Sequence, residues 1–205
     1  MWLDASQGIT LNGSTVSAWV DQSGTANAIE STPANQPIYV ASGGGGIPTL
    51  TFVSNSAMFR GADTLVTNFT IVAVVKVNST YGGYQLIYGN NAGVIFAHGN
   101  ATNVFGIYLG AEVDSTATIT DGNYHICICT VVSVTGAVTF MVDGVSAGTG
   151  TGTSAYAPNS GEIGSGAQPM DGNLSELLEY NTVLSVAQQH SLTAYLGKKY
   201  GIPVS

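Results

Sequence analysis

Charge is what this sequence has least of. Only 8% of its 205 residues are Asp, Glu, Lys or Arg, against about 25% in an average globular chain. Four residues are cationic, Arg60, Lys76, Lys198 and Lys199, and the formal net charge is −8. Nucleic-acid binding needs several Lys or Arg contacts to phosphate, and an anionic membrane surface attracts clusters of them. We therefore expect no nucleic-acid partner, whereas neutral polyols such as glycans remain compatible with the surface.

Long apolar runs and an export signal are missing as well. No stretch approaches the ~18 consecutive apolar residues of a membrane-spanning helix, so we expect no membrane insertion. The start, MWLDASQG, has neither the basic region nor the apolar core of a signal peptide. The sequence is strand-like from Trp2 onward, which predicts either an excised domain with an added Met or a native start without an export signal. We expect an extracellular or virion-surface setting.

Cysteine and histidine are scarce, which limits redox and zinc chemistry. The two cysteines, Cys127 and Cys129, occur in NYHICICTVV, where residues i and i+2 point to the same face of a strand. An extended backbone holds such a pair apart, so we predict two buried thiols that act as small hydrophobic side chains. The three histidines do not cluster in the sequence, so no zinc site is expected.

What the sequence does contain is a series of short β-like segments. They are rich in Val, Ile, Thr, Tyr and Phe and are separated by Gly, Asn, Ser and Pro. FTIVAVVKV (69–77) and YHICICTVV (124–132) are apolar on both faces, which predicts strands covered on each side by two stacked sheets. The other segments are VSAWV (16–20), PIYV (37–40), PTLTF (48–52), YQLIY (84–88), GVIFA (93–97), VFGIYL (104–109) and AVTFMVD (137–143).

Turn signals and one helix complete the pattern. Asp143-Gly144 predicts a tight hairpin turn, and AGTGTGTSA (147–155) predicts a loop. Ser185 with Gln188 predicts the capping box of a helix within 185–203, which would end at a left-handed Gly201. The predicted apolar stripe of this helix combines Val186 or Ala187 with Leu192, Tyr195 and Leu196, and we expect the helix to pack on the edge of a sandwich.

In order and spacing, these segments resemble concanavalin A-like domains of the laminin-G-like type from bacteria and phages. The resemblance implies one domain over residues 1–205, an all-β two-sheet antiparallel jelly-roll sandwich with one C-terminal α-helix. Two positions depart from the family's pattern, because Tyr124 replaces a usual Trp and Ser175 removes a carboxylate near any metal. The segments that carry the resemblance are WLDAS (2–6), VSAWVDQSGTAN (16–27), QPIYV, GGIPTLTF, NFTIVAVVKVNST, DGNYHICICTVV, VTFMVDG and GNLSELLEYNTVLSVAQQHSLTAYLGKKYGI (172–202).

The acidic residues are poorly arranged for catalysis. Glucanases of the resembling fold carry carboxylates as Glu-x-Asp-x-Glu or Glu-x-Asp-x-x-Glu along one strand, and two of them act as nucleophile and acid. Glu112-Val-Asp114 begins such a pattern, but residues 115–117, STA, follow it. Glu176 and Glu179 are three residues apart and would face opposite sides of a strand. We therefore expect no enzymatic activity, and a polysaccharide-active enzyme is kept only as an alternative.

The loop DQSGTAN (21–27) has two open interpretations. Asp21, the Ser23 hydroxyl, backbone carbonyls near Gly24 and the Asn27 amide could supply several of the roughly six or seven oxygens that calcium takes. Glu176 would be a second acid if the final strand returns beside this loop, and the resembling domains often place calcium near one sheet rim. The alternative is an Asx turn, in which Asp21 or Ser23 bonds the backbone and Gly24 takes a positive φ.

Aromatic and amide side chains gather in loop-like segments that could hold a glycan. Rings stack on the apolar faces of sugars, while amides and other polar groups bond their hydroxyls. For each residue the alternative is structural, a tyrosine facing a sheet interior or an asparagine in a turn. The candidates are Tyr81, Tyr84, Asn90 and Asn91 in NSTYGGYQLIYGNN, His98 and Asn100 in HGNATN, and Tyr156 in the Gly/Thr-rich loop.

Together these patterns favour a non-catalytic recognition or surface module. Its partner would be a glycan or, for a phage capsid decoration or tail-fibre domain, another protein of the virion or cell surface. Such a module could also form a homo-oligomer. The alternative from another class is a purely structural assembly protein that binds no sugar, because one fold of this kind serves many functions.

Overall fold

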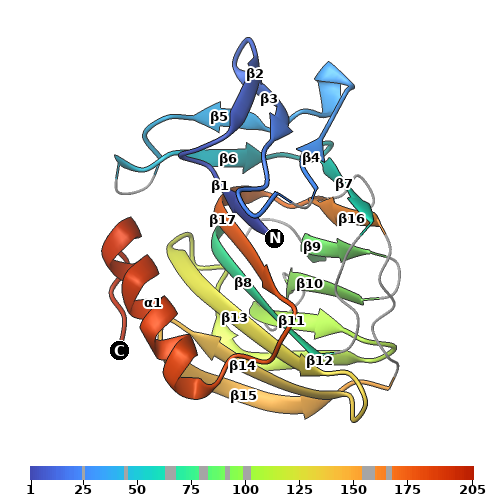
Figure 1. The fold of residues 1–205 in the computed structure, drawn as a ribbon, viewed down its shortest axis with the longest axis vertical. Helices are drawn as coiled ribbons and strands as arrows, with labels where there is room; N and C mark the ends of the chain where they lie inside the picture. Colours follow the sequence, from blue (N-terminus) through green and yellow to red (C-terminus); the bar gives the residue numbers. More distant parts are fainter. Residues whose placement is uncertain are drawn as a thin grey trace.

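A computed structural model describes residues 1–24, 26–43, 46–62, 68–78, 83–90, 93–98, 103–153, 160–164 and 168–205. They form antiparallel strands and one C-terminal helix (Figure 1), which confirms the fold class predicted from the sequence. The elements are β1 (Trp2–Asp4), β2 (Ile9–Asn12), β3 (Thr15–Trp19), β4 (Ala28–Ile29), η1 (Pro33–Asn35), β5 (Ile38–Val40), β6 (Thr49–Phe52), β7 (Met58–Ala62), β8 (Asn68–Val77), β9 (Tyr84–Asn90), β10 (Gly93–His98), β11 (Val104–Tyr108), β12 (Glu112–Thr118), β13 (Tyr124–Val132), β14 (Ala137–Val142), β15 (Val145–Thr151), β16 (Ser160–Ile163), β17 (Gly172–Tyr180) and α1 (Val186–Tyr200).

The strands follow one hydrogen-bonded path that turns back on itself. A first layer runs β15–β14–β13–β8–β17–β6, with β1 beside β17. The path then crosses β5, β3 and β4, with β2 beside β3. It returns as a second layer, β7–β16–β9–β10–β11–β12. This folding-back produces the two stacked layers that the apolar strands require (Figure 1).

Cross-strand register fixes which side chains form the core between the layers. In the second layer, one row of residues is paired strand by strand, and every member belongs to the main core cluster. Phe69, Ile71, Ala73 and Val75 of β8 belong to the same cluster and come from the first layer. Because side chains alternate between the faces of a strand, the paired residues on one side of this row, from Phe59 to Glu112, lie on the outer face. The row is Met58, Ile163, Tyr88, Ile95, Ile107 and Val113.

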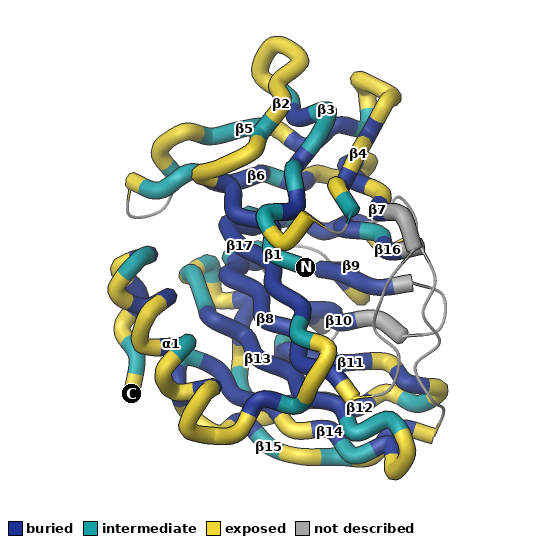
Figure 2. Tube along the Cα trace, in the orientation of Figure 1, coloured by how far each residue is buried: buried dark blue, intermediate teal, exposed yellow. Residues whose placement is uncertain are grey.

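The other face of the first layer is covered by helix α1. Val72 and Val74 of β8, with Ile126 and Ile128 of β13, pack in a second apolar cluster under Leu196 and Tyr200. The prediction that these strands are covered on both sides is confirmed, although one cover is the helix. The prediction that the helix packs on an edge is wrong, because α1 lies over a sheet face that would otherwise be exposed (Figures 1 and 2).

The helix begins and ends as predicted but buries only part of the predicted stripe, Leu196 fully and Leu192 partly. Ser185 and Gln188 form the capping box, and Gly201 has φ 64°. The buried positions are Gln189, Thr193, Leu196, Gly197 and Tyr200, whereas Val186 and Tyr195 are exposed, against the prediction. Polar residues can take part because Gln189 Nε2 donates to the Leu184 carbonyl and Thr193 Oγ1 to that of Gln189.

The predicted hairpin turn is confirmed, but the glycine-rich loop after it is partly a strand. Asp143 (φ 51°) and Gly144 (φ 83°) take the left-handed conformations of a two-residue turn. The segment predicted as a loop over 147–155 contributes residues 147–151 to β15. Glycine is needed in that strand because a Cβ on Gly150 would lie 2.3 Å from Val113 Cγ1.

Candidate functional site

The outer face of the second layer carries a row of residues, of which Ile29, Phe59, Tyr108 and Glu112 are exposed. Apart from Ile29, which pairs with Phe59, each of its residues is next in sequence to a residue of the core row. Strand pairing links them across β4, β7, β16, β9, β11 and β12, and β10 lies between β9 and β11. Phe59 is 51% exposed and Tyr108 is 46% exposed, which is unusual for rings on a sheet. The row is Ile29, Phe59, Glu162, Gly89, Tyr108 and Glu112.

Tyr84, the first residue of β9, lies on this outer face against Phe96. The two rings meet edge to face, with centroids 5.0 Å apart and planes at 86°. A Cβ on Gly106 would lie 2.7 Å from the Phe96 ring and 2.7 Å from Asp114 Oδ1. Glycine at this position therefore lets the Phe96 ring and the Asp114 carboxylate approach the sheet surface together.

The Tyr84 hydroxyl donates a hydrogen bond of 2.5 Å to Glu112 Oε2. Because β9 and β12 are separated by β10 and β11, this bond crosses the face and holds the exposed ring in one orientation. The hydrogen bond to Glu112 raises the pKa of Tyr84 to about 12, with smaller contributions from burial and from the charges of Glu112 and Asp114. Tyr84 is therefore a protonated donor at neutral pH.

The carboxylates of this outer face match the glucanase pattern only in part. Glu112 and Asp114 share the face, since they pair with Tyr108 and Gly106 of β11. The next residue in the same alternation is Thr116, which is exposed, where the glucanase pattern requires a third carboxylate. One oxygen of Glu112 is already bonded to Tyr84. What remains is a surface of rings and polar groups.

The structure places the predicted glycan ligands unevenly. Tyr84 lies on the outer face and is 37% exposed. Asn90 and His98 belong to β9 and β10, but their side chains lie outside the described part of the chain. Tyr81, Asn91, Asn100 and Tyr156 also lie outside the described residues.

Sequence reasoning missed Phe59 and Tyr108. In VFGIYL the core residues Phe105 and Ile107 alternate with Gly106 and Tyr108, so the alternation could have identified Tyr108 as facing outward. MFRGA carries no comparable signal for Phe59.

Residues 21–24 of the loop DQSGTAN form the Asx turn, one of the two interpretations of this sequence. Asp21 Oδ1 accepts bonds from the backbone and hydroxyl of Ser23, at 2.9 and 2.7 Å, and Gly24 has φ 80°. The same oxygen accepts the Trp2 N–H at 2.8 Å, and Asn27 Oδ1 accepts the Asp21 N–H. Thus Asp21 and Asn27 lie together, and the loop fastens the N-terminal strand.

Glu176 lies under helix α1. Its Oε1 accepts the indole N–H of Trp2 at 2.7 Å, and its Oε2 accepts the Lys199 ammonium at 2.6 Å and the Tyr200 hydroxyl at 2.7 Å. Lys199 also bonds Asp4 at 2.8 Å. Glu179 is buried in a separate network with Arg60, which agrees with the prediction that the two glutamates face opposite sides.

These contacts do not fit a shared calcium site. The oxygens of Asp21 and Glu176 face N–H and O–H donors, and a cation at Glu176 would displace Lys199. Among the described residues, no group of three or more His, Cys, Asp or Glu side chains could hold a metal ion. Calcium bound with the help of another loop stays a prediction.

His125 belongs to a further charged cluster beside the Asp143–Gly144 turn. Its Nδ1 lies 2.7 Å from Asp143 Oδ2 and its Nε2 lies 3.0 Å from Asp121 Oδ1. Burial alone would lower the pKa of His125, but the bonds with the two carboxylates raise it above its ordinary value. The protonated ring therefore fastens the turn.

Stability should follow the protonation of His125. A raised pKa means that the stabilising contribution is complete below the ordinary value of 6.5 and is lost as the pH rises through the folded-state value. We expect His125→Gln to lower the unfolding free energy by about 1 kcal/mol at acidic pH and by less at alkaline pH. Urea denaturation across this range measures the difference, with exposed His190→Gln as the matched control. Equal losses at all pH values would contradict the assignment.

Comparison with known proteins identifies the family. Residues 54–188, well over half of the chain, match the family model described as the concanavalin A-like lectin/glucanases superfamily. The chain belongs to this superfamily. The matched segment contains Phe59, Tyr84, Tyr108 and Glu112, so the superfamily region holds the principal exposed rings of the second layer. No curated protein sequence matches the chain.

Solved structures share the concanavalin A-like fold at low sequence identity. Domain 4 of AbnA, a GH43 extracellular arabinanase from Geobacillus stearothermophilus, in complex with arabinotriose, has a TM-score of 0.61 and 19% identity over 77% of this chain and 81% of that one. The binding domain of Paraclostridial Mosquitocidal Protein 1 has a TM-score of 0.65 and 14% identity over 94% and 52%. A putative carbohydrate binding protein from Bacteroides ovatus has a TM-score of 0.58 and 17% identity over 69% and 45%. At these identities the likeness shows the fold alone.

Within the described residues, no helix combines the length and the apolar character needed to cross a bilayer.

Proposed function

We propose that this domain is a non-catalytic glycan-binding module whose ligand lies across the outer face of the second layer. The observation that carries the proposal is the set of exposed rings on that face, Phe59, Tyr84 and Tyr108. Exposed aromatic residues gathered on one surface are typical of binding sites. Their flat faces match the apolar faces of sugar rings, and polar neighbours can bond the hydroxyls.

The spacing of the rings favours an extended oligosaccharide. Phe59 and Tyr108 are separated by four strand-to-strand steps through β16, β9 and β10. At about 4.8 Å per step they lie roughly 19 Å apart. A single sugar could contact only one of the two rings, so affinity should increase with chain length.

The charges on the outer face favour a neutral glycan. Glu112, Asp114 and Glu162 all lie on this side of the second layer. Of the four cations, Arg60 and Lys199 are engaged in buried or partly buried ion pairs. Uronic, sialic or sulfated sugars would meet carboxylates and be repelled.

Tyr108→Ala should weaken the affinity for a neutral oligosaccharide about tenfold, because it removes an exposed stacking ring. A glycan array with and without calcium would select the ligand, and isothermal titration would measure the change. Tyr195→Ala is the matched control, since Tyr195 is 56% exposed on helix α1, which covers the other layer. Equal affinity of the Tyr108 and control variants would contradict the proposed site.

Other outcomes of the same experiments would favour the alternatives. Silence of the whole array would favour a structural assembly protein that binds no sugar. Release of reducing sugar from mixed polysaccharides would favour an enzyme and contradict the non-catalytic role. A homo-oligomer on a virion or cell surface stays part of the proposal, and light scattering of the purified chain tests its oligomeric state.

A further inference from the structure

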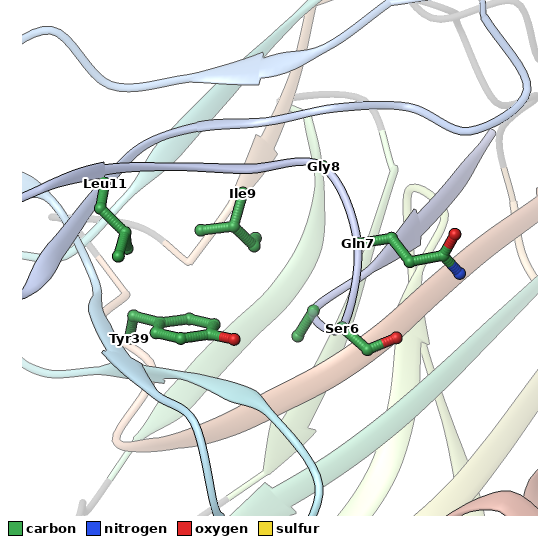
Figure 3. A pocket seen from close by; sticks show the side chains of 7 residues that line it. Ser6, Gln7, Gly8, Ile9, Leu11 and Tyr39 are labelled. Carbon is green, nitrogen blue, oxygen red and sulfur yellow. The ribbon is translucent and has the colours of Figure 1, made fainter.

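A pocket of about 270 Å³ lies between β2 and β5, outside the segment that matches the superfamily. In Figure 3, Ile9 and Leu11 of β2 point toward the ring of Tyr39 on β5. The Tyr39 hydroxyl points toward the loop 6–8, which closes one end. The pocket is lined by Ala5, Ser6, Gln7, Gly8, Ile9, Leu11 and Tyr39.

The loop at the end of the pocket is held rigidly from behind. Asp4 Oδ1 accepts the backbone N–H and the hydroxyl of Ser6, at 2.8 and 2.6 Å, and Asp4 Oδ2 accepts the Gln7 amide at 3.0 Å. Gly8 has φ +66°, and a Cβ there would lie 2.6 Å from Gln22 Nε2. The walls are therefore preformed, and a ligand need not order them on binding.

The lining defines the chemistry of an occupant. No charged side chain lines the pocket, so a neutral molecule fits better than an ion. The volume lies just below the ~300 Å³ at which drug-sized sites begin, which leaves room for one small ring. The ring of Tyr39 offers a flat apolar face on one side, and Ile9 and Leu11 offer an aliphatic wall on the other.

Polar groups are few inside this pocket. Ser6 and Gln7 turn their side chains away from Tyr39, toward the far side of the loop (Figure 3), where both bond Asp4. Within the described part of the chain, the Tyr39 hydroxyl has no hydrogen-bond partner and is available to a ligand. A sugar hydroxyl beside the aliphatic side chains of Ile9 and Leu11 would find no hydrogen-bond partner in them. A sugar with a methyl group at that edge would therefore leave fewer hydroxyls unsatisfied than an ordinary hexose.

We propose that this pocket is a second glycan site that takes one terminal 6-deoxyhexose residue. Its methyl group would lie against Ile9 and Leu11, its ring against Tyr39, and a hydroxyl near the Tyr39 hydroxyl. The site is separate from the outer face of the second layer and does not depend on binding there.

Matched sugar pairs that differ by one oxygen test the proposal. The probes are the methyl glycosides of 6-deoxygalactose and galactose, and of 6-deoxymannose and mannose, each pair with the same configuration. Saturation-transfer NMR and titration with the full chain should show the deoxy sugar of at least one pair binding about tenfold more tightly than its partner. The methyl protons should receive the strongest transfer.

Variants then locate the binding. Leu11→Trp should abolish it by filling the pocket, and Tyr39→Phe should weaken it severalfold by removing one hydroxyl while keeping the ring. Val134→Trp introduces the same side chain at another exposed position and should have no effect. Absence of a deoxy preference, or binding that survives Leu11→Trp, would overturn the proposal.

The tests of the two glycan sites can fail independently. If deoxy-sugar binding is lost in Tyr108→Ala but kept in Leu11→Trp, the sugar binds the outer face of the second layer, and only the pocket proposal fails. If Tyr108→Ala leaves all oligosaccharide binding intact while Leu11→Trp abolishes deoxy-sugar binding, the pocket proposal stands without the proposed function.

Discussion

Arg60→Ala is expected to lower the free energy of unfolding by about 3–5 kcal/mol, the typical cost of removing one partner from a buried ion pair. Arg60 Nη1 donates to Glu179 Oε2 at 2.8 Å and to the Tyr88 hydroxyl at 2.9 Å. Its Nη2 lies 4.0 Å from Asp21 Oδ2, and the side chains of all three charged residues are at most 1% exposed. The substitution would leave two buried carboxylates without their cation.

Urea denaturation measures this loss, and Lys198→Ala is the control because it removes the same charge from an exposed position. The control should change stability by less than about 0.5 kcal/mol. The double variant Arg60→Met with Glu179→Gln should recover part of the loss, since it removes a buried charge together with its partner. A loss below about 1 kcal/mol for Arg60→Ala would show that water reaches this network.

Lys199→Met should lower the free energy of unfolding by roughly 3 kcal/mol at neutral pH, because Lys199 is the shared cation of two buried carboxylates. Asp4 and Glu176 side chains are each 1% exposed, and Lys199 bonds both. Methionine keeps most of the aliphatic stem, so the effect isolates the charge. Helix α1 would lose its ion pairs with Asp4 of β1 and Glu176 of β17.

The contribution of this network to stability should depend on pH, because the pKa values of Asp4 and Lys199 differ from their ordinary values. Burial alone would raise the pKa of Asp4, but bonds from Lys199, Ser6 and Gln7 lower it below its usual 3.8. Burial alone would lower the pKa of Lys199, but Asp4 and Glu176 raise it above 10.5. The network therefore contributes fully between about pH 4 and 10.5, and its contribution falls beyond both limits.

The difference between wild type and Lys199→Met should accordingly narrow below about pH 4, because the contribution of Asp4 is lost as the pH falls through its lowered folded-state pKa. Melting temperatures from neutral pH to pH 3 measure it, with Lys198→Met as the control on the same helix. A constant difference over that range would contradict a role for the charge and favour a loss of packing alone.

Local patterns made most of the fold predictable. The capping box at Ser185, the turn at Asp143-Gly144, the doubly apolar strands β8 and β13 and the buried Cys127 and Cys129 all depend on neighbours in sequence. The position of α1 was mispredicted because a helix that packs on a face and one that packs on an edge can share the same amphipathic pattern. The strand β15 was missed because its glycines resemble those of a loop. They are needed for the close approach of β12, and no pattern of neighbouring residues in the sequence reveals that contact.

The candidate site was less predictable because it depends on register between strands far apart in sequence. Tyr84 could be selected from its segment, but its bond to Glu112 crosses two intervening strands. Phe59 joins the same face only through pairings of β7 with β16 and of β16 with β9. Arg60 was recognisable as the chain's one arginine, yet nothing in the sequence linked it to Glu179.

The position of the few cations also determines how a protease meets this protein. Trypsin cuts after Lys and Arg, and all four of these residues lie within regular elements, Arg60 in β7, Lys76 in β8 and Lys198 and Lys199 in α1. Nicking of folded proteins concentrates at exposed loop tips, and the loops of this chain carry no trypsin target. Tryptic cleavage would therefore require a strand or the helix to open first. The rate of digestion would then measure unfolding of these elements.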